Sequence, residues 1–145
     1  MNDNKLNGMM SKVWGPMLWH TLHIISFNYP LNPTKKQKEE YNKFIISLQY
    51  ILPCKYCRDN LTTNFKKAKY SKKVFKNRKN FSKFIYNLHN IVNLSLGKTK
   101  YKSYDEVQKF YEKFRASCDK NNKKCKDPLV GNTKYKSKIN FISFS

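Results

Sequence analysis

Two cysteines, Cys54 and Cys57, have the spacing in this 145-residue chain that points most directly to chemistry. Pro53 precedes the pair and can end one helix, so that Cys54 opens the next. The first sulfur then lies near the positive end of the helix dipole, which favours the thiolate, and Lys55 and Arg58 add positive charge. The second sulfur is close enough to close a disulfide. The motif therefore predicts a redox dithiol that passes electrons by thiol–disulfide exchange.

A Cys-x-x-Cys pair is also half of a structural zinc site, and the rest of the chain would have to supply the other half. The chain contains four cysteines and three histidines. Cys118 and Cys125 are separated by six residues, and His20 and His23 are too close together for the usual pair of histidine ligands. These spacings favour redox chemistry, and a zinc-stabilised helical module is the alternative.

Two polar and aromatic clusters flank the cysteines in sequence. Trp19 and His23 are one helical turn apart, and by themselves they indicate a core aromatic ring beside a hydrogen-bonded histidine. His89, Asn90 and Asn93 differ, because a histidine and two asparagines within five residues are poor choices inside a helix. Each polar group beside an apolar face needs a partner. A bound ligand with ring nitrogens, carbonyls, ribose and phosphates would supply such partners.

Two common folds for nucleotide or redox sites are disfavoured by the pattern. No Gly-x-Gly-x-x-Gly loop is present, which excludes a Rossmann-type dinucleotide site. The sequence also lacks the alternation of strands and helices that would indicate a βαβ unit. This absence counts against a thioredoxin fold for the cysteine pair. Lys98 lies just after the predicted helix that carries the second polar cluster, and it could meet a phosphate of the ligand.

Apolar periodicity predicts an almost entirely helical chain. The first helix is expected to begin near Pro16, which can occupy a first turn, and to end before Tyr29 and Pro30. Thr34 can cap a second helix that extends to Pro53, and the third begins at Cys54.

The second half of the chain continues the helical pattern and then changes composition. Residues 66–79 are rich in lysine and are expected to be a solvated connection. A fourth helix is predicted over about residues 80–96, with Gly97 as its C-terminal stop, and Ser103 can cap a short fifth helix. Residues 119–145 are rich in Lys, Asn, Asp, Pro and Gly, which predicts a basic tail with little fixed structure.

The charge of the chain is strongly basic, with 30 Lys and Arg against 9 Asp and Glu and a net charge of +21. Such a balance is typical of proteins that bind nucleic acid, membrane surfaces or acidic partners. Nearly all of the cations are lysines, and Asn, Ile, Tyr and Phe are also abundant, so A/T-rich codons explain the same composition. Two non-enzymatic functions would fit this charge. One is a zinc-stabilised module that binds nucleic acid or acidic partners, and the other is a basic packaging factor.

The sequence carries no signal for membrane insertion or secretion. Lys, Asn or His interrupts every apolar stretch well short of the roughly 20 residues needed to span a bilayer. Residues 1–11 are polar, lack the apolar segment of a signal peptide and are expected to be a flexible N-terminus. We therefore expect a cytoplasmic protein, in which a cysteine pair is more often catalytic or metal-binding than a structural crosslink.

The clusters together resemble a known family. Trp14-Gly15-Pro16-x-x-Trp19-x-x-x-His23, followed by Tyr29-Pro30, resembles the first helix of the Erv/ALR family of FAD-linked sulfhydryl oxidases. Pro53-Cys54-x-x-Cys57 resembles the flavin-proximal disulfide of that family, and Leu88-His89-Asn90-x-Val92-Asn93-x-x-Leu96-Gly97-Lys98 resembles its flavin-binding helix. The resemblance covers about residues 12 to 118, and it is greatest to the compact forms encoded by large cytoplasmic DNA viruses.

The resemblance implies an all-α fold, a four-helix bundle that holds FAD, with a short fifth helix and usually a homodimer. It implies a thiol oxidase that forms disulfides in thiol-containing protein substrates and passes the electrons to dioxygen, giving hydrogen peroxide. Cys57 would face the flavin, and Cys54 would exchange with incoming thiols. The implied cofactor-binding residues are Trp14, Gly15, Trp19, His23, Tyr29, His89, Asn90, Asn93, Leu96 and Lys98.

The chain departs from the family pattern in its other cysteines. The structural disulfide of cellular members would need a cysteine near Ser103 or Tyr104 to pair with Cys118, and none is present there. Cys118 and Cys125 could instead form a C-terminal shuttle disulfide, or they could be exposed thiols or a small local disulfide. We expect an oxidase domain over residues 12–118, with the shuttle partly in the basic tail of a protein located in the host cytoplasm or a virion.

Overall fold

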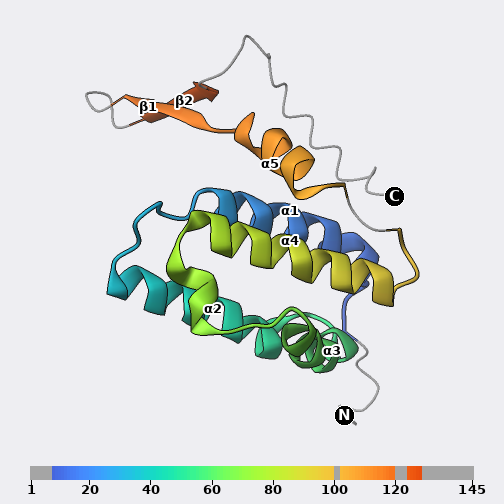
Figure 1. The fold of residues 1–145 in the computed structure, drawn as a ribbon. Helices are drawn as coiled ribbons and strands as arrows, with labels where there is room; N and C mark the ends of the chain where they lie inside the picture. The colour runs from blue at the N-terminus through green and yellow to red at the C-terminus, as the bar shows by residue number, and fades with distance from the viewer. Residues whose placement is uncertain (1–7, 100–101, 120–123, 129–145) are drawn as a thin grey trace. The chain divides into compact units, whose positions relative to one another are not determined.

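The structure, a computed structural model, describes residues 8–99, 102–119 and 124–128. Its elements in chain order are α1 (Ser11–Phe27), α2 (Lys35–Ile51), α3 (Lys55–Lys67), the 3-10 helix η2 (Lys72–Lys76), α4 (Arg78–Ser95), α5 (Tyr104–Glu112), β1 (Ala116–Asp119) and β2 (Lys124–Pro128) (Figure 1). The chain divides into two compact units at residues 101/102, which places α1–α4 in the first unit and α5 with the two strands in the second. The all-α prediction is confirmed for the first unit. None of the described helices is long and apolar enough to span a bilayer.

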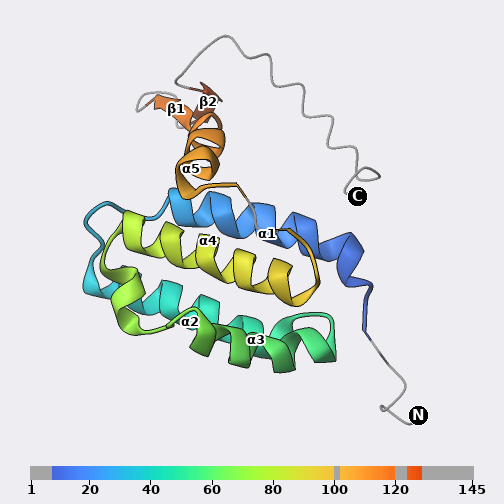
Figure 2. The same ribbon diagram turned by 45° about the vertical axis from the view of Figure 1, so that its right-hand side comes forward.

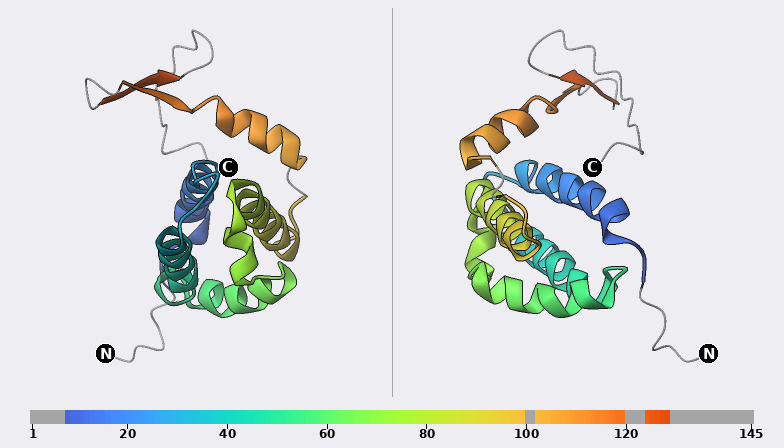
Figure 3. Two further views of the ribbon diagram at one scale, coloured as in Figure 1. Left: turned by 60° about the vertical axis from the view of Figure 1, so that its left-hand side comes forward. Right: turned by 90° about the vertical axis from the view of Figure 1, so that its right-hand side faces the viewer.

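The first unit is a bundle in which α1 lies along α4, and α2 packs against α3 and η2 (Figures 1 and 2). Figure 3 shows the four helices surrounding a shared interior. Apolar side chains at helical spacing fill that interior, which is why the periodic pattern located the helices. The fully enclosed part of this core consists of Tyr29, Ile45, Phe75, Phe81, Ile85 and Leu88.

Side-chain caps fix where several helices begin, as the sequence predicts. Thr34 and Gln37 form a reciprocal capping box at α2, and Ser103 and Glu106 form another at α5. Each box satisfies two backbone N–H groups that would otherwise have no partner at a helix start. Asn77 caps α4 by accepting a hydrogen bond from the backbone N–H of Asn80.

The predicted start of the first helix is wrong. Helix α1 begins at Ser11, so Pro16 lies inside the helix and not in its first turn. Residues 8–10 are fixed as well, because the backbone N–H of Met9 donates a 2.7 Å hydrogen bond to the carbonyl of Pro53. The expected flexible N-terminus over residues 1–11 is therefore wrong for residues 8–11, and residues 1–7 lie outside the described residues. Tertiary contact, which has no local sequence signal, extends the ordered chain here.

The expected solvated connection over residues 66–79 is also partly wrong. It contains the end of α3 and the 3-10 helix η2, and Phe75 of η2 is only 1% exposed. The Tyr29 hydroxyl donates a 2.8 Å hydrogen bond to the Phe75 carbonyl, and the Phe75 ring packs against Phe81. Two aromatic side chains, Tyr70 and Phe75, turn this lysine-rich segment toward the core.

The second unit contains a two-stranded antiparallel hairpin that the sequence did not predict. The backbone register pairs Cys118 with Cys125 and Asp119 with Lys124, with an irregularity between Ala116 and Ser117. The expectation of little fixed structure from residue 119 onward is therefore wrong for Asp119 and for residues 124–128. Residues 120–123 and 129–145 of the predicted tail lie outside the described residues. Lysine and asparagine dominate the composition and hide the strands.

Helices α3 and α4 end in the same hydrogen-bond pattern. At α4, Gly97 has a positive φ of 70°, and the N–H of Lys98 donates to the carbonyl of Asn93. At α3, Lys69 takes the corresponding place with a φ of 55°, and the N–H of Tyr70 donates to the carbonyl of Phe65. Glycine enters this left-handed region without steric penalty, whereas a residue with a Cβ is strained there. Gly97 confirms the predicted helix stop, and Lys69 carries strain at the equivalent position.

We expect Lys69→Gly to raise the free energy of unfolding by about 0.5–1 kcal/mol, because glycine removes the left-handed strain. Urea unfolding followed by circular dichroism measures the change. Lys69→Ala is the matched control, since it removes the charge but keeps the Cβ, and it should be close to neutral. Equal stability of the glycine and alanine variants would contradict the prediction.

Candidate functional site

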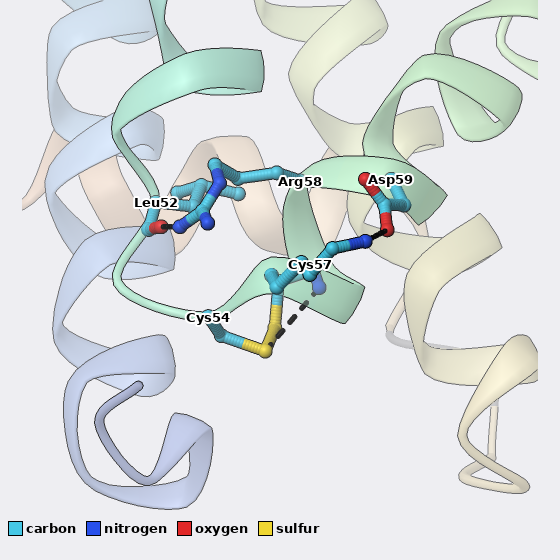
Figure 4. A network of polar contacts seen from close by, with 6 residues as sticks. Leu52, Cys54, Cys57, Arg58 and Asp59 are labelled. Carbon is cyan, nitrogen blue, oxygen red and sulfur yellow. Dashed lines mark hydrogen bonds and ion pairs between the residues drawn. A yellow bond between two sulfur atoms is a disulfide. The ribbon is translucent and has the colours of Figure 1, made fainter. Parts of the chain in front are cut away.

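The two cysteines of the predicted dithiol are joined as a disulfide at the start of α3 (Figure 4). Their Cα atoms are 5.2 Å apart, and the N–H of Cys57 donates to the Cys54 sulfur at 3.2 Å. Cys54 is the N-cap of α3, so its sulfur takes the place of a capping oxygen. A thiolate at this atom is stabilised by the helix dipole and by the N–H group that points at it. Cys57 packs against the core cluster and is therefore the inner sulfur of the pair.

The charged neighbours of the disulfide have different roles. The Arg58 guanidinium donates from Nη1 to the Leu52 carbonyl at 2.5 Å, which anchors the loop between α2 and α3 (Figure 4). Lys55 forms an exposed ion pair with Asp59 at 2.7 Å, so a carboxylate offsets part of the positive charge that the sequence suggested near the pair. Arg58 thus both holds the loop and contributes positive charge beside it.

Residues 8–10, which we call the N-terminal strap, also hold this loop. In addition to the bond from Met9 to Pro53, the Trp14 indole N–H donates to the Met9 carbonyl at 3.0 Å. Gly8 has a φ of 76°, and a Cβ added there would lie 2.3 Å from the Pro53 carbonyl oxygen and 3.0 Å from the Cys54 Cα. Only glycine fits this close approach. Sequence reasoning missed the strap, because a single glycine in a polar segment gives no local signal of a distant contact.

The second cluster lies between α1 and α4. His23 Nε2 and His89 Nδ1 are 2.9 Å apart and form a hydrogen bond, although the two residues are 66 positions apart in the sequence. The Trp19 ring stacks on the His89 ring with 4.3 Å between centroids and 9° between planes. The structure therefore brings together three of the residues that the sequence predicted to bind a cofactor, and His89 contacts each of the other two.

Burial keeps these two histidines uncharged. Burial, followed by repulsion from His89 and His20, lowers the pKa of His23 to about 3. Burial, followed by repulsion from Lys98, lowers the pKa of His89 to about 4. Near neutral pH both imidazoles are neutral, so one ring donates and the other accepts the hydrogen bond between them.

The remaining predicted binding residues are not all in one place. Asn93 is half-buried one turn beyond His89, and Lys98 lies just past the end of α4. Asn90 is buried and lines a groove of about 350 Å³ between the end of α3 and α4. Tyr29 is fully buried in the core with its hydroxyl bonded to Phe75, and Leu96 is 64% exposed.

Two of the predicted binding residues, Trp14 and Gly15, lie in the first turns of α1. Trp14 packs against the core cluster and holds the strap, and a Cβ added at Gly15 would meet nothing within 4 Å. Open space therefore lies beside Gly15, in the turn before Trp19. The backbones of Cys118 and Cys125, the two cysteines of the second unit, face each other in the hairpin.

Comparison with known proteins decides the family. The sequence model of the Erv1/Alr family matches residues 16–115. This chain belongs to the Erv1/Alr family. The family predicted from the residue clusters is thereby confirmed, and the match begins after the N-terminal strap.

Viral and cellular relatives are similar in sequence and in fold. The chain is 35% identical to a probable FAD-linked sulfhydryl oxidase of Acanthamoeba polyphaga mimivirus, over 72% of this chain and 73% of that protein. It is 30% identical to a putative FAD-linked sulfhydryl oxidase of Invertebrate iridescent virus 6, over 59% of this chain and 81% of that protein. The crystal structure of the yeast Erv1 core superimposes with a TM-score of 0.60 at 26% identity, over 75% of this chain and 86% of that one.

We expect acid to destabilise the bundle through His23 and His89. The unfolded chain binds protons at these groups below about pH 6.5, whereas the folded protein does not until about pH 4 or lower. Stability should therefore be fully present above pH 6.5 and fall by up to about 6 kcal/mol between pH 6.5 and pH 4. Urea unfolding at a series of pH values measures this dependence.

His89→Gln tests the assignment, because glutamine stays uncharged over this range and should reduce the pH dependence to the part that comes from His23. His20→Gln is the control, since His20 lies on the same helix as His23 but is less deeply buried, and its variant should keep most of the slope. A His89→Gln protein with the original slope would rule out the pair as its origin.

Proposed function

We propose that this chain is a FAD-dependent thiol oxidase that forms disulfides in protein substrates. The observation that carries the proposal is a disulfide at the N-terminus of α3, in a bundle of the Erv1/Alr family whose α1 and α4 contribute a stacked Trp19–His89 pair and a buried His23. The relatives named above are FAD-linked sulfhydryl oxidases, which supports both the activity and the cofactor.

The residues present fit a flavin. A flat ring system needs flat apolar walls and uncharged hydrogen-bonding groups, and the Trp19 and His89 rings with the neutral imidazole of His23 are groups of this kind. Open space beside Gly15 leaves room at the same helix, and the charge of Lys98 reaches His89, which suits a phosphate nearby. We propose that Asn93 and Asn90 add amide contacts to the cofactor. Trp14, Tyr29 and Leu96 would support the site from a greater distance.

The proposed reaction begins with a substrate thiolate that attacks the Cys54 sulfur. The Cys54–Cys57 bond breaks, its electron pair stays on Cys57 as a thiolate, and a mixed disulfide forms at Cys54. A second substrate thiolate attacks that mixed disulfide, which releases oxidised substrate and leaves Cys54 as a thiolate. Two electrons have then entered the pair, and the two substrate protons have gone to solvent.

Each sulfur has a position suited to its step. Cys54 lies in the loop, where the helix dipole and the N–H of Cys57 stabilise its thiolate as a leaving group. Cys57 packs against the core, on the side from which electrons would leave the pair. FAD, held by the residues named above, would supply the two-electron acceptor between this pair and dioxygen, with hydrogen peroxide as the expected product.

We further propose a second redox pair at Cys118 and Cys125. Residues directly opposite in an antiparallel ladder have Cα atoms about 4.5–5.5 Å apart, which falls within the range that a disulfide bridges. The hairpin register places these two cysteines opposite each other. A shuttle at this place would carry electrons from bulky substrates to Cys54, in the same subunit or in its partner in a homodimer. Val13 and Ile24, the exposed large apolar residues of α1, are the candidate dimer surface, and the viral relatives support a location in host cytoplasm or a virion.

We expect Cys57→Ser to keep bound FAD and to lose oxidation of dithiothreitol by at least about 100-fold, because no disulfide can form with Cys54. Visible absorption measures the flavin, and oxygen consumption measures turnover. Cys118→Ser is the control with the second pair disrupted, and it should retain activity on dithiothreitol. Normal turnover by Cys57→Ser would overturn the proposed function.

The double variant Cys118→Ser/Cys125→Ser separates a shuttle from a local crosslink. A shuttle predicts that oxidation of a reduced protein substrate falls while oxidation of dithiothreitol is unchanged. Parallel assays with reduced ribonuclease and dithiothreitol measure both rates. Unchanged oxidation of the protein substrate would show that the pair takes no part in electron transfer.

A further inference from the structure

Exposed apolar side chains gather at the redox loop. Among the described residues, eleven large apolar side chains are exposed, and six of them belong to three short segments near Cys54. These segments are the strap with the start of α1, the end of α2, and the residues between the two cysteines. The six residues, 52–76% exposed, are Met9, Met10, Val13, Tyr50, Ile51 and Tyr56.

Hydrogen bonds and chain geometry bring the three segments together. The Met9 backbone N–H lies 2.7 Å from the carbonyl oxygen of Pro53, the residue before Cys54. Ile51 is three residues before Cys54 and Tyr56 two residues after it, so their Cα atoms lie within about 11 Å and about 8 Å of the Cys54 Cα. We call Met9, Met10, Tyr50, Ile51 and Tyr56 the apolar collar.

The strap is built to keep its methionines at the loop. Gly8 has a conformation and a close approach to Pro53 that a Cβ would prevent, and Trp14 bonds the Met9 carbonyl from α1. The family match begins at residue 16, so the strap lies outside the part of the chain that the family model describes. The disulfide lies within the part of the chain that matches the family, whereas the strap residues of the collar lie outside it.

The chemistry of the collar fits an apolar polypeptide. In a chain of net charge +21, all five collar residues are uncharged. Concentrated exposed apolar side chains mark interaction surfaces, and methionine and tyrosine adapt to varied apolar partners. A polypeptide thiol that reaches Cys54 brings the residues that flank it close to these neighbours of the loop.

We propose that the apolar collar is the docking surface for apolar residues that flank a cysteine in the polypeptide substrate. This inference rests on the proposed exchange at Cys54. It adds the substrate class: cysteines in apolar sequence surroundings, as in a chain that has not yet buried them, in preference to cysteines in polar segments or in small dithiols.

The test uses two synthetic peptides with the same Cys-x-x-Cys core, one flanked by Leu and Phe and the other by Ser and Asn. Each peptide reduces the Cys54–Cys57 disulfide of the full chain without oxygen, and acid quenching with mass spectrometry gives the rate. We expect the apolar peptide to react about tenfold faster. Met9→Ser/Ile51→Ser should bring the two rates together without changing the rate with dithiothreitol.

Leu31→Ser is the matched control. Leu31 is 64% exposed, against 63% for Ile51, but it lies in the loop between α1 and α2, at the opposite end of these helices from the collar. This variant should keep the tenfold preference. Gly8→Ala should lose the preference by displacing the strap, whereas Gly97→Ala, which has a similar positive φ but open space around it, should keep it.

Three results would overturn the inference. They are equal rates for the two peptides, an equal loss of preference in Leu31→Ser, and a loss of self-association in Met9→Ser/Ile51→Ser with the preference intact. Sedimentation velocity measures self-association, and the last result would assign the collar to a second copy of the chain. Failure of the proposed function is distinct, because the full chain would then bind no FAD and consume no oxygen with dithiothreitol, whatever the rates at which the two peptides reduce the disulfide.

Discussion

The packing of α1 against α4 through the buried His23–His89 hydrogen bond is the interaction on which the proposed site depends. The buried His23 and the partly buried His89 are tolerated because both remain neutral and share a hydrogen bond. The contact fixes the position of α1 along the axis of α4, and the Trp19 ring is held on His89 as a consequence. A charged residue at either position would lose this arrangement, since burial of an unpaired charge is far more costly than burial of a bonded neutral ring.

The redox loop is held by three hydrogen bonds from two elements, α3 and the strap, which explains how a short loop can present two sulfurs in fixed places. Arg58 of α3 bonds the Leu52 carbonyl, Met9 of the strap bonds the Pro53 carbonyl, and the Cys57 N–H bonds the Cys54 sulfur. Trp14 connects the strap to α1, so the loop and the helix that carries Trp19 and His23 are joined by hydrogen bonds. Disulfide exchange requires a defined approach to one sulfur, and this bracing leaves Cys54 as the sulfur in the loop.

Local signals were sufficient for much of the fold and for the nature of the site. Thr34, Ser103 and Gly97 act at helix ends as their chemistry predicts, because caps depend on neighbours only a few residues away. Positions without local signals were misjudged. Lysine-rich composition hid the burial of Phe75, and the strand pairing of Cys118 with Cys125 was hidden in a basic segment.

The sequence alone determined the cysteine spacing, the polar clusters on the first and fourth helices and the family to which they belong, because each of these depends on residues within one or two helical turns. Only the tertiary structure decided that His23 bonds His89, that Gly8 lies against Pro53 and that Asn90 lines a groove beside α3. These contacts join residues far apart in the chain, and their geometry follows from how whole helices pack. Periodicity identifies the face of a helix that is buried, but not the atom that it meets.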